Sequence, residues 1–255
     1  MSSIDVDPPV ETAPPSGPSF EAPRERPSKA RLGALALAAG LLAGLASWLA
    51  EESIHGRFRP PLTATAGFAT PAETAVATAS YRRGVLAETS IAFGLLGAAL
   101  GAALGAAGGL ARRSPRDAGV AAALGAALGV AAGVAAVQIT VRLAFRLLAQ
   151  DEDGLEAALL VQGAIAGLIG AAAGAALGLG AGGRRAVPQA LVGGVVGAVV
   201  GVVAYQVVGA LMFPLDETTR PVAITPAARG AAQLLVASFI AIGAALGFAP
   251  PPSKA

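Results

Sequence analysis

The stretch from Gly97 to Gly109 reads GAALGAALGAAGG and constrains the fold of this chain more than any other segment. It places a glycine at every fourth position, at Gly97, Gly101, Gly105 and Gly109. Residues four apart lie on the same face of an α-helix, so the pattern predicts a nearly flat stripe without side chains. Such a stripe lets the backbone of another helix approach closely, which is how helices associate in lipid. We therefore expect an all-α membrane protein with glycine-zipper packing.

The composition also indicates a membrane protein. Of the 255 residues, 55% are hydrophobic and 13% are charged, whereas a soluble domain carries about 25% charged residues. The net charge of +2 argues against a nucleic-acid-binding protein, which would show a clustered basic face. The chain has no cysteine, which excludes disulfides and thiolate metal sites. Abundant alanine, glycine and arginine are typical of GC-rich coding sequences and favour a bacterial inner (plasma) membrane as the location.

Six apolar segments follow a proline-rich N-terminal region. Residues 1–27 show no periodicity and are expected to form a disordered cytoplasmic tail. Each apolar segment is near or above the roughly 20 residues needed to cross a bilayer, and a backbone in lipid must form helices. We therefore expect one six-span transmembrane domain over 28–250 and a short tail at 251–255. The predicted spans are about 31–50, 85–111, 117–141, 155–182, 187–213 and 229–249.

Several segment boundaries carry local signals. The first span resembles a signal sequence, but Trp48 would occupy the −3 position of a cleavage after Ala50, so we expect an uncleaved anchor. Three Ser/Thr-Pro pairs have the form of a capping residue followed by proline at the first helical position. They begin at Thr70, Ser114 and Thr225. Thr70 precedes the second span by about fifteen residues, which predicts that this helix begins well outside the membrane.

Arginines in the short turns predict the orientation of the chain. Two tight turns contain Arg112, Arg113 and Arg116, and Arg184 and Arg185. An even number of spans places both turns on the same side as the two termini. Positively charged short loops favour the cytoplasm, so we expect both termini to be cytoplasmic.

The middle four spans contain a pattern that indicates an internal duplication. Spans two and four match at an offset of 69 residues, and spans three and five at 68. Copies separated by an even number of spans have the same orientation, so the pattern predicts a parallel duplication of a two-helix hairpin. The alternative is that Ala/Gly-rich helices align by chance. The rows in spans three and five are Gly125, Gly129, Gly133 and Gln138, and Gly193, Gly197, Gly201 and Gln206.

Polar residues within the apolar segments are the candidates for function, because such groups usually face a bundle interior or a water path. Glu88, Glu156, Gln138 and Gln206 are the candidate path residues, and Glu88 and Glu156 occupy near-equivalent places in the two copies. The alternative is that the glutamates cap helix ends and the glutamines only link helices. His55 is interpreted as a solvated loop residue. The remaining intramembrane polar residues are Gln162, Tyr205 and Gln233.

Two classes of function fit these features. The first is a structural or assembly protein packed through small-residue helix faces, with the bilayer and a second copy or another membrane protein as partners. The alternative is a small repeat-built transporter or channel for a cation or proton. An enzyme is not expected, because the sequence holds no motif with a nucleophile or an acid–base pair. We also expect no metal site and no cofactor.

Overall fold

The computed structural model describes residues 28–58, 70–147, 155–214, 216 and 222–248. These residues form six long α-helices and one short 3-10 turn, and no strand occurs among them. All six helices are long and apolar enough to cross a membrane, so the chain is a multi-pass membrane protein with an all-α fold, as predicted. The predicted N- and C-terminal tails lie outside the described residues. The helices are α1 (Lys29–Ile54), α2 (Pro71–Ala111), α3 (Pro115–Leu147), α4 (Leu155–Gly182), α5 (Val187–Met212) and α6 (Pro226–Gly247).

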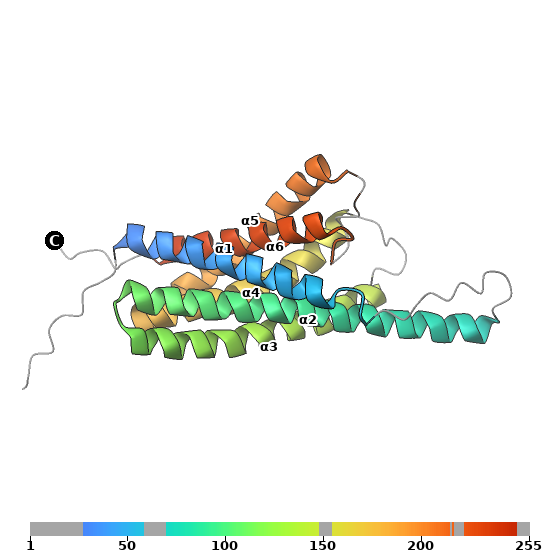
Figure 1. Cartoon of the computed structure of the whole chain (residues 1–255), viewed down its shortest axis with the longest axis horizontal. Coiled ribbons are helices and arrows are strands. Elements are labelled where there is room, and N and C mark those ends of the chain that lie inside the picture. The colour runs from blue at the N-terminus through green and yellow to red at the C-terminus, as the bar shows by residue number, and fades with distance from the viewer. Residues whose placement is uncertain (1–27, 59–69, 148–154, 215, 217–221, 249–255) are drawn as a thin grey trace, which may run out of the picture.

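Each predicted cap is present at the start of its helix. At α2 the Thr70 hydroxyl accepts from the Glu73 amide at 3.3 Å, and the Glu73 carboxylate accepts from the Thr70 amide at 2.8 Å, forming a capping box. Ser114 and Thr225 accept equivalent amide hydrogen bonds at 3.4 and 3.3 Å. The first part of α2 extends beyond the other helices, as Figure 1 shows, and residues 72–80 are exposed.

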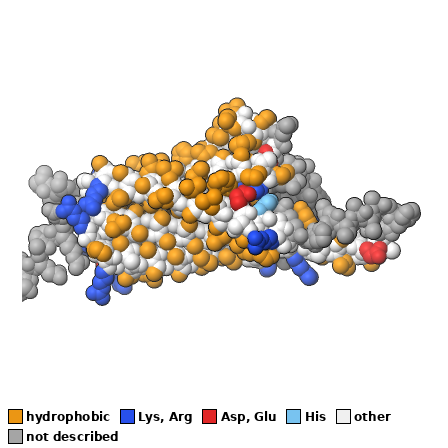
Figure 2. Space-filling model, in the orientation of Figure 1, with side chains coloured by type: hydrophobic (Ala, Val, Ile, Leu, Met, Phe, Trp, Pro, Cys, Tyr) orange, Lys and Arg blue, Asp and Glu red, His pale blue; other side chains and the backbone are white. Residues whose placement is uncertain are grey.

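Helices α2 and α4 pack against each other at the centre of the bundle. Helix α3 packs on both of them, α1 packs on α2 and α6, and α5 packs on α4 and α6. The core is built from fully buried aliphatic side chains such as Leu100, Leu104, Ile165 and Ile169. Hydrophobic side chains cover the length of the face shown in Figure 2, with Lys and Arg gathered toward its two ends. This distribution fits a bundle whose sides contact lipid.

Glycines form the contact between α2 and α3. A Cβ atom added at Gly97 would overlap the carbonyl oxygen of Gly129, and one added at Gly101 would overlap that of Gly125. Gly105 approaches the carbonyl oxygen of Ala121 in the same way. The two backbones therefore touch along this line, and a side chain at any of these positions would force the helices apart.

The second glycine row, in α5, packs against α6. Gly193 and Gly197 approach the carbonyl oxygens of Gly243 and Phe239, which belong to α6. Gly201 also lies against α6. The glycines that match at the offset of 68 thus face α2 in α3 but face α6 in α5.

The α2–α3 hairpin and the α4–α5 hairpin share an equivalent glycine contact. Each residue of this contact in the second hairpin lies 69 positions after its counterpart in the first. Gly101 meets Gly125 between α2 and α3, and Gly170 meets Gly194 between α4 and α5. The register of these contacts therefore differs by one residue from the register that the sequence pattern of α3 and α5 favoured. The duplication itself stays a prediction.

Candidate functional site

Three helices bring ionisable side chains together at one level of the bundle, where α1 ends and α6 begins. We call this group the ionic cluster. Its central members are largely buried: the exposed fraction is 2% for Glu51, 1% for Glu88 and 3% for Arg229. Buried charged groups in a membrane protein are costly and mark functional sites. The members of the ionic cluster are Glu51, Glu52 and His55 from the end of α1, Glu88 from α2, and Arg229 and Gln233 from α6.

Arg229 holds the ionic cluster together. Its Nε and Nη2 atoms donate to the two carboxylate oxygens of Glu52 at 2.7 and 2.8 Å, the paired geometry in which a guanidinium binds a carboxylate most strongly. Its Nη1 atom donates to the backbone carbonyls of Ala223 at 3.0 Å and Ile224 at 2.6 Å. The side chain therefore joins the end of α1 to the segment that precedes α6.

His55 links Arg229 to Glu88. The Nη1 atom of Arg229 lies 3.1 Å from Nε2 of His55, and because arginine only donates, Nε2 accepts. Nδ1 on the other side of the ring lies 2.7 Å from Oε1 of Glu88, within ion-pair distance. The amide of Gly56 donates to the same oxygen at 2.9 Å. Gly56 has a φ of 77°, a left-handed conformation that glycine adopts without strain and that turns the chain at the end of α1.

Glu51 has a different environment from the other two glutamates. The Nε2 atom of Gln233 donates to its carboxylate. The guanidinium of Arg229 is bonded to Glu52 instead. Among the described residues, the hydrogen-bond partner of this buried carboxyl group is therefore a neutral amide.

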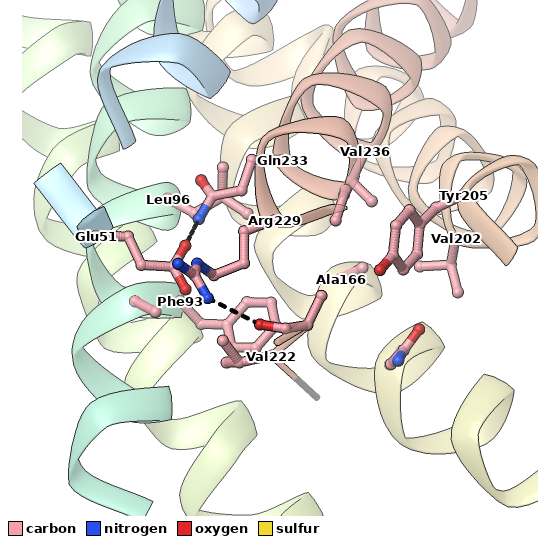
Figure 3. Close-up of a pocket in the computed structure, with 14 residues that line it drawn as sticks. Glu51, Phe93, Leu96, Ala166, Val202, Tyr205, Val222, Arg229, Gln233 and Val236 are labelled. Atoms are coloured by element: carbon pink, nitrogen blue, oxygen red, sulfur yellow. Dashed lines mark hydrogen bonds between the residues drawn. The ribbon is translucent and has the colours of Figure 1, made fainter. Parts of the chain in front are cut away.

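A cavity of about 60 Å³ lies beside the ionic cluster, lined by residues of α1, α2, α4, α5 and α6. Figure 3 shows Glu51, Gln233 and Arg229 on one side of it and Tyr205 on the other, with the tyrosine hydroxyl pointing toward the cavity. Ala223, from the segment before α6, also lines it. The remaining wall is mostly apolar and includes Phe93, Leu96, Ala166, Val202 and Val236.

The four candidate path residues lie in separate places. Glu88 belongs to the ionic cluster, whereas Glu156 is exposed near the start of α4. Gln138 donates to the Ser90 hydroxyl of α2 at 2.9 Å. Gln206 donates to Gln162 of α4 at 2.8 Å. The structure therefore does not gather these four side chains around one cavity.

The sequence analysis does not predict four members of the site, which are Glu51, Glu52, His55 and Arg229. It interprets His55 as a solvated loop residue, whereas His55 contacts Arg229 and Glu88 within the ionic cluster. A signal was available, because Arg229 is the first residue of the predicted sixth span and Glu51 directly follows the first span. Gln162, Tyr205 and Gln233 were recognised as intramembrane polar residues, and all three line the cavity.

Comparisons with known proteins add no family to this description. No family model, no curated protein and no solved structure matches the chain. Among the described residues, no group of three or more His, Asp or Glu side chains is arranged to hold a metal ion.

Proposed function

We propose that this protein is a membrane transport protein that binds a proton at Glu51 and passes it through the cavity. The observation that supports the proposal is the environment of Glu51, a buried carboxyl group that lines a cavity and is bonded to a neutral amide. A carboxylate in such surroundings gains little from its partner, so taking up a proton removes an unfavourable buried charge. Ionisable residues of this kind form the proton relays of membrane pumps and transporters.

The surroundings of Glu51 favour a proton over a metal cation. A bound metal ion needs several oxygen ligands to replace its hydration shell. The cavity wall is mostly apolar, so few of the residues that line it carry an oxygen that could replace this shell. A proton requires only one carboxylate oxygen. Within the transport alternative, Glu51 thus takes the role first assigned to Glu88 and Glu156.

The glycine contacts do not favour the assembly alternative. The rows at Gly97, Gly129 and Gly193 lie against helices of the same chain. Assembly with a second copy or another membrane protein through these rows would require them to leave their present contacts. Glycine packing then serves to build the bundle, and the buried charges are the feature that requires a functional explanation.

Proton flux into liposomes tests this function. Purified protein is reconstituted with a pH-sensitive dye inside the vesicles, and a potassium gradient with valinomycin drives proton entry. We expect the parent to acidify the vesicles, and Glu51→Gln to lower the rate by about a hundredfold, the lower end of what a positioned proton-transferring group contributes. The matched control is Glu156→Gln, which removes an exposed glutamate and should leave the rate unchanged.

Two results would contradict the proposal. One is a parent protein that acidifies vesicles no faster than protein-free vesicles do. The other is a Glu51→Gln variant as fast as the parent. Circular dichroism and size-exclusion chromatography on each variant establish that a loss of flux is not a loss of fold.

A further inference from the structure

Two buried polar atoms at the cavity have no protein partner among the described residues. They are the hydroxyl oxygen of Tyr205 and the carbonyl oxygen Oε1 of Gln233. Tyr205 is 4% exposed and Gln233 8% exposed, so bulk solvent does not satisfy either atom. Buried polar groups in proteins are almost always bonded to protein or to ordered water. Their orphan state therefore points to something that occupies the cavity.

The size and the lining of the cavity fit water. A volume of about 60 Å³ exceeds several times the roughly 10–15 Å³ that one water molecule requires. Apolar cavities stay dry, but a cavity with two to four polar partners holds water. Glu51 and Gln162 also line this cavity and add polar groups to those of Tyr205 and Gln233.

We propose that the cavity is a binding site for a cluster of ordered water molecules, anchored by Gln233 and Tyr205, and that this water carries the proton to Glu51. Tyr205 is a positioning residue in this scheme, because its hydroxyl fixes the side of the cluster away from Glu51. The proton path rests on the proposed transport function, whereas the water site does not.

The proton step is balanced within the cluster. A water molecule beside Glu51 releases one proton to a carboxylate oxygen as a new O–H bond forms. That molecule then accepts one proton from its neighbour, and the same exchange repeats along the cluster. The last water molecule accepts a proton from hydronium in the bulk solvent, which becomes water. Each water molecule of the cluster is then restored, Tyr205 keeps its own proton, and the net change is one proton moved from the solvent to Glu51.

Radiolytic hydroxyl-radical labelling tests the water site without any transport assay. Radiolysis of bound water produces radicals where the water lies, so a buried side chain next to it becomes oxidised. We expect oxidation of Tyr205, which is buried, and of Phe93, which is half-buried and lines the cavity. We expect none above background at Leu100 or Leu104, which are fully buried and do not line the cavity. Val202→Leu and Ala166→Val, which fill the cavity independently, should lower oxidation of Phe93. Background oxidation of Tyr205 and Phe93 in the parent would show a dry cavity and overturn the proposal.

The positioning role is tested with the two tyrosines of the chain. Tyr205→Phe keeps the ring and removes the hydroxyl, so we expect lower oxidation of Phe93 and a proton flux lowered about tenfold, the change expected for losing one hydrogen bond. Tyr81→Phe, near the part of α2 that extends beyond the other helices, is the matched control. It should alter neither the oxidation of Phe93 nor the proton flux. Unchanged oxidation and flux in Tyr205→Phe would overturn the role of Tyr205. If the parent carries no protons, the transport function fails while the labelling still decides the water site.

Discussion

Arg229 and Glu52 form a two-bond ion pair although 177 residues separate them in the chain. The pair joins the first helix to the last, and Arg229 also binds the backbone carbonyls of Ala223 and Ile224. One buried side chain therefore holds three separate segments in place around the cavity. Removing it leaves several acceptors without a donor at once.

We expect Arg229→Gln to lower the free energy of unfolding by about 1–3 kcal/mol, the cost of leaving charged hydrogen-bond partners unsatisfied, because Arg229 is buried but Glu52 is only half-buried. The measurement is denaturant or thermal unfolding in detergent. The matched control is Arg184→Gln, which removes an exposed arginine from the turn between α4 and α5 and should change stability by less than about 0.5 kcal/mol. Equal stability of the two variants would show that the ion pair does not hold these segments together.

The glycine contacts predict position-specific effects of adding a single methyl group. Gly129→Ala places a Cβ against the carbonyl oxygen of Gly97, so the helices must separate, and we expect a loss of about 1–3 kcal/mol. Gly163→Ala on α4 meets no atom within 4 Å, so it should be neutral or slightly stabilising. Both are measured by unfolding in detergent. Similar stabilities would mean that the α2–α3 contact tolerates a wider spacing.

The orientation of the chain is open to cysteine labelling, because the protein has no native cysteine. Ser80 is exposed on the outer part of α2, and Ser114 lies in the turn between α2 and α3 at the opposite end of the helix. With cytoplasmic termini, an impermeant thiol reagent added to intact cells should label Ser80→Cys but not Ser114→Cys. Ser114→Cys should become labelled after the cells are opened. The reverse pattern would place the termini outside.

The sequence predicts the helices well because their signals are local. Apolar length and capping pairs set the start of α2 at Pro71, of α3 at Pro115 and of α6 at Pro226. The end of α1 is the instructive exception, because the predicted span stops at Ala50 whereas the helix continues to Ile54. In the sequence Glu51 and Glu52 mark the end of an apolar segment. Only their bonds to Gln233 and Arg229, from the far end of the chain, explain why Glu51 is buried and Glu52 is half-buried.

The rotation of each helix about its own axis is harder to predict, because it depends on contacts with distant parts of the chain and not on local signals. Helix α5 carries glycine on more than one face, so that Gly193 meets α6 and Gly194 meets α4. A glycine row shows where a close approach is allowed, but it does not specify the neighbour. The same holds for the site. Gln162, Tyr205 and Gln233 can be identified from the sequence as polar residues in apolar helices, but their convergence on one cavity depends on how the helices are rotated.

The single tryptophan provides a final prediction for the contact between α1 and α6. The Nε1 atom of Trp48 donates to the carbonyl oxygen of Pro226 at 3.0 Å, and the indole ring covers Gly230. A Cβ at Gly230 would lie 3.2 Å from a ring carbon, closer than an ordinary contact, so the ring must shift by a few tenths of an ångström.

We therefore expect Gly230→Ala to change the Trp48 emission spectrum and its quenching by a brominated lipid. Because the shift strains the bond to Pro226, the free energy of unfolding should fall by about 0.5–1.5 kcal/mol, the net worth of one hydrogen bond. Gly33→Ala on α1, which meets nothing within 4 Å, is the control and should leave the emission unchanged.

The same shift should also disturb the ion pair between Arg229 and Glu52, because Arg229 stands next to Gly230 in α6. The losses of stability in Gly230→Ala and Arg229→Gln should therefore be less than additive in a double-mutant cycle. Strict additivity would show that Trp48 and the ionic cluster hold α1 and α6 together independently.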